Sequence, residues 1–213
     1  TVSHLEEQAG RANRIGISMP GVVNRSGEPI MVANLPWLRD KPFRPDLERL
    51  FERPVHIGND ANCFALSEAT DGSAAGAKLV FGVILGTGVG GAIVVNGQIV
   101  TGANAIAGEW GHNPLPWRTP EDGAETMCGC GQTGCIETWL NGAALSRDYQ
   151  ALSGSEAKAK DISRLAEEND AAATQAISQY AERLARALAS AINFFDPDII
   201  VLGGGLSEIS GLY

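Results

Sequence analysis

Apolar positions in the second half of the chain recur with the period of a helix. Between residues 161 and 195 they are spaced by three or four residues, which places them on one buried face. These positions are Ile177, Tyr180, Leu184, Leu188, Ala191 and Phe195. The pattern stops at Pro197, because proline cannot continue a helix. The apolar run 199–202 that follows predicts a buried strand, which ends in a glycine triplet.

Short strands and helices alternate in the rest of the chain. The sequence predicts strands over 14–21, 55–58, 78–85 and 92–95, and helices over 46–51 and 63–69. Such alternation is typical of an α/β fold with glycine-rich loops at the ends of its strands. Small residues from Asp71 to Gly76 predict the junction between two domains, residues 1–75 and residues 76–213.

Composition and charge exclude several classes of protein. Hydrophobic residues make up 44% of the chain, which supplies a folded core and excludes low-complexity disorder. Lys and Arg number 16 against 25 Asp and Glu, and this net charge of −9 disfavours binding to nucleic-acid phosphates. The uncharged stretch from Leu79 to Gly108 is too rich in glycine for a membrane helix. The first residues lack the basic and apolar runs of a leader peptide, and we expect a cytoplasmic protein.

Three of the four cysteines lie close together in the sequence. Cys128, Cys130 and Cys135 share a short glycine-rich segment, and His112 precedes them. One histidine and three cysteines close a tetrahedral structural zinc site, and the glycines allow the backbone to bring the sulfur atoms together. Reduced thiols without a metal are the alternative. Cys63, alone in an apolar segment, is expected in the core.

Two glycine-rich segments follow predicted strands. The loop 86–91 leaves backbone N–H groups free to face an anion, with the Thr87 hydroxyl as an added donor. The triplet Gly203–Gly205 permits the close approach of a nucleotide. Each segment is also consistent with a tight turn that binds no ligand. Neither is followed by the Gly-Lys-Ser/Thr of a Walker loop.

Three carboxylates are candidates for chemistry. Asp60 lies where a predicted strand passes into a predicted helix, where it can accept the proton of a substrate hydroxyl or simply cap the helix. Glu109 precedes His112 by three residues and Glu137 follows Cys135 by two, so a metal would hold both acids rigidly. Carboxylates are among the groups with which proteins bind sugar hydroxyls. The alternative is a pair of solvated acids.

Taken in order, the motifs resemble those of the ROK family of bacterial sugar kinases and repressors over essentially the whole chain. They are Met19-Pro20-Gly21, Asn59-Asp60-Ala61-Asn62, Gly86-Thr87-Gly88-Val89-Gly90-Gly91, Gly108-Glu109-Trp110-Gly111-His112, Cys128-Gly129-Cys130 with Gly134-Cys135-Ile136-Glu137, and Asp196-Pro197-Asp198 with Gly203-Gly204-Gly205. Within the family, residues 107–117 look most like the bacterial fructokinase (manno-fructokinase) branch. The N-acetylglucosamine kinase branch is a close second.

This resemblance implies an actin-like ATPase (ribonuclease H-like) fold, with two α/β domains and the active site in the cleft between them. It implies a homodimeric hexose kinase that uses ATP with Mg²⁺, carries a structural Zn²⁺ and converts fructose to fructose 6-phosphate. Asp60 would be the general base, and His112 would use one ring nitrogen for zinc and the other for the sugar. By similarity, the hexose contacts are Gly21, Asn34, Asn59, Asp60, Glu109, His112 and Glu137. The ATP contacts are Gly86, Thr87, Gly88, Gly90, Gly203, Gly204 and Gly205.

The sequence departs from the family pattern at both ends. The Asp-x-Gly-Gly-Thr phosphate loop of the family does not occur before Arg14, and elements expected after Gly205 are missing. We therefore expect a chain that is truncated at both ends.

Three alternative functions stay open. The first is an N-acetylglucosamine kinase or glucokinase of the same family. The second is the sugar-sensing domain of a ROK repressor, although no helix-turn-helix or basic segment is found in the sequence. The third, a zinc hydrolase, needs an open metal position that a closed site of three cysteines and one histidine does not offer.

Overall fold

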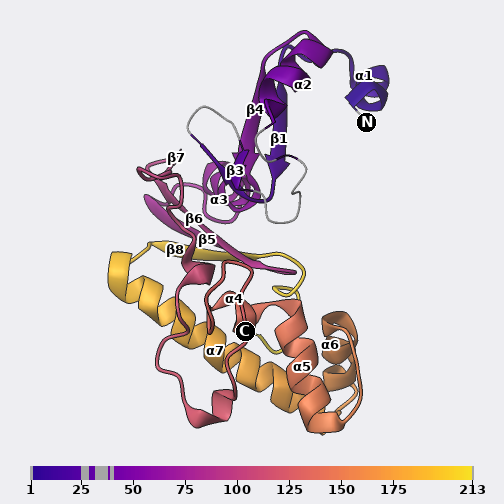
Figure 1. Ribbon diagram of the computed structural model, residues 1–213, viewed down its shortest axis with the longest axis vertical. Helices are drawn as coiled ribbons and strands as arrows, with labels where there is room; N and C mark the ends of the chain where they lie inside the picture. Colours follow the sequence, from indigo (N-terminus) through magenta and orange to yellow (C-terminus); the bar gives the residue numbers. More distant parts are fainter. Residues whose placement is uncertain (1, 25–28, 32–37, 39–40, 213) are drawn as a thin grey trace. The chain divides into compact units, whose positions relative to one another are not determined.

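The computed structural model describes residues 2–24, 29–31, 38 and 41–212, and these form two compact units (Figure 1). The first unit comprises residues 1–63 and 101–106, and the second comprises residues 64–100 and 107–213. The sequence passes from the first unit to the second within helix α3 (Asp60–Thr70). The reason is packing, because Phe64 lies against Gly203 and Ala65 lies against Gly82 in the second unit. The expected domain boundary itself stays a prediction.

The first unit is built around a pair of parallel strands, β1 (Ile15–Met19) and β4 (Val55–Asn59), which confirm the strands expected there. Alternate residues of both strands point into a small core of Met19, Val55 and Ile57. The remaining elements of this unit are helix α1 (Val2–Ala9), strand β2 (Val22–Val23), strand β3 (Pro29–Met31) and helix α2 (Phe43–Phe51).

The second unit contains a four-stranded sheet in the order β7-β6-β5-β8. Strands β5 (Leu79–Leu85) and β6 (Val89–Val95) form an antiparallel hairpin, β7 (Gln98–Ile99) extends it, and β8 (Ile199–Gly203) runs parallel to β5. The hairpin turn is shorter than expected, because Val89, Gly90 and Gly91 already pair with β5. The uncharged stretch therefore begins with paired strands. No helix in the described part of the chain has the length and apolar character needed to cross a membrane.

Helices form a layer against this sheet. Apolar side chains of α7 (Ala171–Phe195), including Ile177, Tyr180 and Leu184, share one core with Phe81, Val83 and Leu85 of β5. The expected helical stretch 161–195 is in fact two helices, because a break at residues 168–170 separates α7 from α6 (Ala159–Glu167). Asp170 caps α7 by accepting a hydrogen bond from the Ala173 N–H at 2.7 Å. The layer also contains α4 (Glu137–Leu140) and α5 (Gly142–Ser153) (Figure 1).

A long segment with little regular structure, residues 107–136, connects the sheet to α4. Asp122, at the end of the short 3₁₀ helix η3 (Pro120–Asp122), fastens this segment to α7. The residue is 8% exposed, and its carboxylate accepts hydrogen bonds from Arg183 Nε at 3.1 Å and from Arg186 Nη1 at 2.9 Å. The segment is thereby anchored to α7 by a buried cluster of charged side chains.

The environment of Asp122 makes this anchor sensitive to acid. Burial alone would raise the pKa of the carboxyl group, but hydrogen bonds from Arg186, the Thr119 N–H and Arg183 hold that pKa well below its usual value. A carboxyl group with a pKa depressed by folding contributes stability above its unfolded pKa. That stability is lost as the pH falls through the unfolded value toward the folded one.

We expect Asp122→Ala to lower the free energy of unfolding by about 1–3 kcal/mol at pH 7, the usual cost of leaving buried hydrogen-bonding groups unsatisfied, because Arg183 keeps its ion pair with Asp148. The deficit should shrink below about pH 4, where the parent loses the same contribution by protonation. Urea unfolding at pH 7 and pH 3 measures both values, with exposed Glu121→Ala as the control. An equal deficit at both pH values would contradict this account.

Candidate functional site

The first unit brings together Gly21, Asn59 and Asp60. Because β1 and β4 are parallel and in register, Met19 and Asn59 are paired at the carboxyl ends of the two strands. The Asn59 amide donates a hydrogen bond to the carbonyl oxygen of Gly21 at 3.0 Å, which ties the turn after β1 to the end of β4. Asn34, the other contact expected in this unit, lies outside the described residues.

The sequence left open whether Asp60 caps the helix or accepts a proton from a substrate, and in the structure Asn59 provides the cap. The side-chain oxygen of Asn59 accepts the Asn62 N–H at 3.0 Å, as a helix cap does. One oxygen of Asp60 accepts the Ala61 N–H at 2.9 Å and the Asn59 amide at 3.1 Å. Within the described part of the chain the other oxygen has no hydrogen-bond partner, and Asp60 is exposed. Asp60 is therefore held in place while one oxygen stays available.

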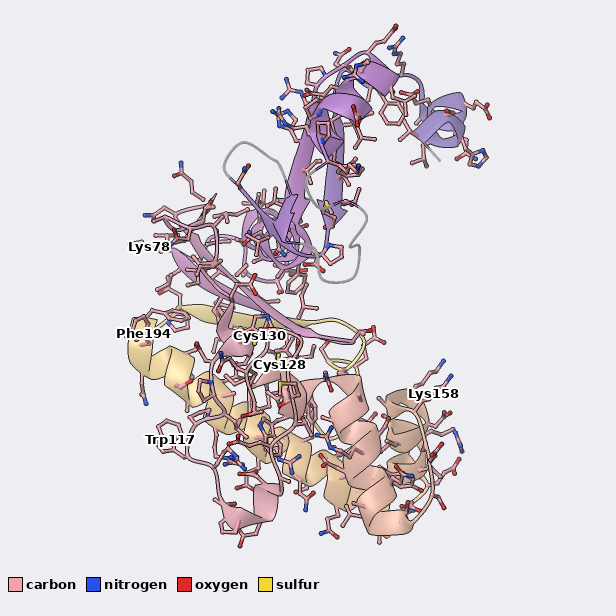
Figure 2. All side chains as sticks on the ribbon, viewed as in Figure 1. Lys78, Trp117, Cys128, Cys130, Lys158 and Phe194 are labelled. Atoms are coloured by element: carbon pink, nitrogen blue, oxygen red, sulfur yellow. The ribbon has the colours of Figure 1, made fainter. Side chains whose placement is uncertain are left out.

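The second unit brings the expected metal ligands together. The ligand atoms of His112, Cys128, Cys130 and Cys135 all lie within 4.8 Å of one another, and Figure 2 labels two of these cysteines. The sulfur atoms of Cys130 and Cys135 are 3.6 Å apart, and Cys128 Sγ is 3.5 Å from His112 Nδ1. A zinc tetrahedron with bonds of ~2.3 Å to sulfur and ~2.0 Å to nitrogen has edges of about 3.5–3.8 Å. The side chains present fit that metal.

Burial and neighbouring groups shift the pKa values of the three thiols in this cluster. Burial, followed by the neighbouring thiols of Cys130 and Cys128, raises the pKa of Cys135 to about 12. Burial likewise raises the pKa of Cys128, whereas the Gln132 N–H lowers that of Cys130. Three adjacent thiolates repel one another unless a positive charge lies between them. Metal binding supplies that charge and requires the deprotonated form.

His112 faces two partners with its two ring nitrogens. Nδ1 points to Cys128, and Nε2 lies 3.8 Å from a carboxylate oxygen of Glu109. The side chains of His112 and Glu109 are 39% and 36% exposed, so both reach solvent. A metal on Nδ1 would leave Nε2 beside Glu109 as a donor, which pairs an N–H donor with a carboxylate acceptor in one accessible place.

The turn that carries Glu109 and His112 is pressed against the start of β6. The Trp110 indole donates a hydrogen bond to the Gly90 carbonyl at 3.1 Å, and its ring packs edge-on against Phe81. A Cβ on Gly111 would lie 2.1 Å from the Val89 carbonyl oxygen, so only glycine fits at that position. This packing explains why Gly90 and Gly91 belong to the strand instead of to a free loop.

The two glycine segments lie side by side at one end of the sheet. The Leu206 N–H donates to the Leu85 carbonyl at 3.0 Å, and a Cβ on Gly204 would lie 2.4 Å from that same oxygen. The carbonyl of Gly86 accepts the N–H of Gly142, the first residue of α5, at 2.9 Å. The turn 86–88, the triplet 203–205 and the start of α5 therefore converge after β5 and β8. Parallel strands commonly place ligand-binding loops at such carboxyl ends.

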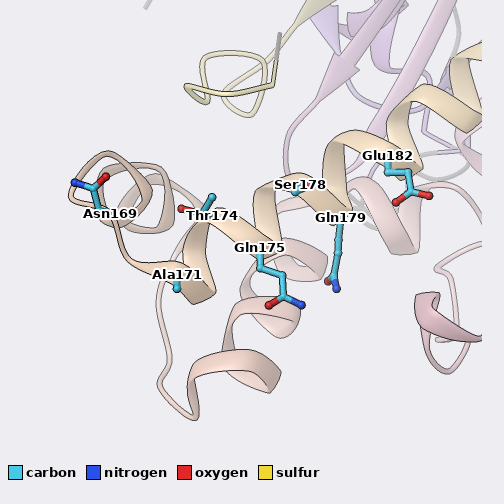
Figure 3. Close-up of a pocket in the computed structure, with 7 residues that line it drawn as sticks. All are labelled: Asn169, Ala171, Thr174, Gln175, Ser178, Gln179 and Glu182. Carbon is cyan, nitrogen blue, oxygen red and sulfur yellow. The ribbon is translucent and has the colours of Figure 1, made fainter.

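Several contributors to this site could not be found from the sequence. The backbone N–H of Val89 donates a hydrogen bond to Glu137. Asp122 pairs with Arg183 and Arg186, which lie 61 and 64 residues further along the chain. The only earlier signal for Trp110 was its place in a motif. A separate polar hollow of about 530 Å³ runs along α7 and contains none of the expected site residues (Figure 3).

Comparisons with known proteins identify the family and the fold of this chain. The sequence matches the ROK family over residues 1–213. The N-acetyl-D-glucosamine kinase of Pectobacterium carotovorum subsp. carotovorum (strain PC1) is 39% identical over 216 residues, covering all of this chain and 71% of that kinase. The ROK hexokinase of Thermus thermophilus superposes with a TM-score of 0.81 at 35% identity, covering 97% of this chain and 67% of the hexokinase.

Two further structures of lower identity share the fold. A ROK family glucokinase from Streptomyces griseus, solved with glucose and AMPPNP, has a TM-score of 0.81 at 28% identity and covers 99% of this chain and 73% of its own. A ROK family transcriptional regulator, a homologue of the E. coli MLC protein, has a TM-score of 0.80 at 25% identity, covering 99% and 56%. With its whole length matched and its α/β architecture shared, this chain belongs to the ROK family and has the actin-like ATPase fold of that family.

Proposed function

We propose that this protein is an ATP-dependent sugar kinase that transfers the γ-phosphate of ATP to a hydroxyl group of a hexose. The observation that carries the proposal lies at the end of β4, where Asn59 caps the helix and Asp60 has one oxygen without a hydrogen-bond partner among the described residues. In the transfer, the sugar oxygen forms a bond to the γ-phosphorus atom and its proton passes to Asp60. The bond from the γ-phosphorus to the bridging oxygen breaks, and ADP leaves.

The remaining expected residues divide between the two substrates. Glu109, His112 and Glu137 offer two carboxylates and an imidazole N–H for sugar hydroxyls, and Gly21 and Asn59 frame Asp60. The backbone of residues 86–88 and 203–205 would lie against ATP, because both segments combine exposed or half-buried glycines with the carboxyl end of a strand. The Mg²⁺ that accompanies ATP would neutralise phosphate charge. Gly90 and Asn34 as ligand contacts, and the homodimer, stay predictions.

Zinc is proposed as a structural ion. His112, Cys128, Cys130 and Cys135 would fill all four positions, so the ion would hold the segment 107–136 and would leave no position for substrate. The metal and the Asp122 ion cluster would then anchor the same segment at two separate points.

We expect one zinc ion per chain and a marked loss of thermal stability in Cys130→Ser, because metal-binding free energy is part of the folding free energy. Metal analysis and thermal unfolding measure the two effects. Cys63→Ser, at the cysteine outside the cluster, is the matched control and should retain both zinc and melting temperature. A Cys130→Ser protein that melts like the parent would refute the structural role.

Asp60→Asn tests the proposed base. Asparagine keeps the size and the oxygen that accepts the Ala61 N–H, but it cannot take the proton of the sugar hydroxyl. We expect turnover to fall by roughly 10²–10⁴ while sugar affinity changes little. Steady-state kinetics and calorimetry measure the two quantities. Asp71→Asn, an exposed acid just beyond α3, controls for loss of charge. Near-normal turnover in Asp60→Asn would show that Asp60 is not the base.

The preferred hexose is proposed as N-acetylglucosamine, because several relatives that are 39% identical to this chain are N-acetyl-D-glucosamine kinases. The comparisons give no support to fructose, the first choice from the sequence. Fructose stays as the second candidate only because residues 107–117 resemble the fructokinase branch.

A coupled assay of ADP release by the full-length protein, with N-acetylglucosamine, glucose, mannose and fructose, ranks these candidates. We expect N-acetylglucosamine to give the highest kcat/KM. Sugar binding without phosphorylation of any of the four would favour the second candidate function, a sugar sensor, which the likeness to the ROK transcriptional regulator supports.

A further inference from the structure

The two carboxylate oxygens of Glu137 face different parts of the second unit. Oε2 accepts a hydrogen bond from the Val89 backbone N–H at 3.0 Å, directly after the glycine turn 86–88. Oε1 lies 3.6 Å from Cys128 Sγ, within the metal cluster. Glu137 is half-buried at the first position of α4. One side chain therefore links the metal cluster to the glycine turn.

The glycine turn is shaped around this carboxylate. A Cβ on Gly88 would lie 2.7 Å from Glu137 Oε2, so a side chain at residue 88 would displace the carboxylate from the Val89 N–H. At Gly86, two residues earlier in the same turn, a Cβ would meet no atom within 4 Å. The requirement for glycine at position 88 is thus specific to the contact with Glu137.

Glu137 is one of the proposed sugar contacts. Its Oε2 accepts the Val89 N–H, and among the described residues its Oε1 has only the long contact with Cys128 Sγ. A carboxylate oxygen accepts hydrogen bonds, and a sugar hydroxyl is a suitable donor for Oε1. Glu137 would then hold the sugar with one oxygen and the glycine turn with the other.

We propose that Glu137 is a positioning residue that couples sugar binding to the order of the turn that holds the ATP phosphates. A sugar hydroxyl on Oε1 fixes the carboxylate, and the fixed carboxylate in turn fixes the Val89 N–H and the turn 86–88. The turn has a second support, since Gly111 and Trp110 pack against Val89 and Gly90 from the segment that carries Glu109 and His112. This inference rests on the proposed kinase function, and by linkage ATP should strengthen sugar binding by the same factor.

The first test measures the affinity of the full-length, zinc-loaded protein for AMPPNP with Mg²⁺, with and without a saturating concentration of the best sugar of the panel. We expect the sugar to tighten binding by about 5-fold or more in the parent, within the usual range for coupled sites. In Gly88→Ala the sugar should still bind, but the tightening should fall below about 2-fold. Gly86→Ala, the matched change in the same turn, should retain the parent's ratio whatever its affinity for AMPPNP.

The second test needs no sugar and measures the hydrogen bond between the Val89 N–H and Glu137 directly. Hydrogen exchange at the Val89 amide should be faster in Glu137→Ala than in the parent, because the N–H loses its acceptor. Glu137→Gln should restore the slow exchange, since its amide oxygen still accepts that N–H. Equal exchange rates at the Val89 amide in Glu137→Ala and the parent would overturn the inference. It would also be overturned if the sugar left the parent's affinity for AMPPNP unchanged, or if the sugar tightened AMPPNP binding in Gly88→Ala as much as in the parent. If no sugar binds the parent, the proposed function fails, and the exchange measurement alone decides the role of Glu137.

Discussion

The close approach of two glycine-containing backbone segments is the constraint on which the second unit depends. The start of β6 and the turn 108–112 come so close that the Val89 carbonyl leaves no room for a side chain at Gly111. The Trp110 indole closes the same contact with its hydrogen bond to Gly90 and its packing on Phe81. Because β6 also continues from the glycine turn 86–88, this contact joins the proposed sugar-binding turn 108–112 to the proposed phosphate-binding turn.

Around this contact, the segment 107–136 depends on electrostatics more than on regular secondary structure. At one point the ligand atoms of three cysteines and a histidine lie within 4.8 Å of one another, an arrangement that fits a metal ion. At another, Asp122 is buried between two arginines of α7. Such anchors have strict geometry and strict charge requirements. They suit a segment that must present Glu109 and His112 at fixed positions although it contains only single turns of helix.

The proposed catalytic group in the first unit follows a simpler design. A parallel strand pair ends at Asn59, and the helix that follows begins at once with Asp60. Asn59 provides both the cap and the tie to Gly21, which spares one oxygen of Asp60 from structural use. The Asn59 amide thus fixes the position of the Asp60 carboxylate through only one of its two oxygens. Fixed position is what general base catalysis requires of such a group.

Local sequence determined much of this protein. Periodicity predicted strands over 14–21, 55–58 and 199–202, where the structure has β1, β4 and β8, and a helical stretch over 161–195 that contains α7. The spacing of Cys128, Cys130 and Cys135 with His112 predicted the cluster. These features depend on neighbours in the chain or on residue types with few other uses. The helix break at 168–170 was missed, because the apolar period continues across it and only the Asp170 cap interrupts it.

Only the tertiary structure decided the features that depend on distant segments. The role of Asp122 cannot be predicted from the sequence, because its partners Arg183 and Arg186 are more than sixty residues away. Strand β6 begins earlier than expected because its first residues pair with β5 and because Trp110 donates a hydrogen bond to Gly90. Neither contact can be predicted from the glycine content of the segment. The bond from Val89 to Glu137 uses a backbone N–H, which every residue except proline carries. A sequence specifies which groups a chain contains, but the contacts between remote groups are fixed by packing.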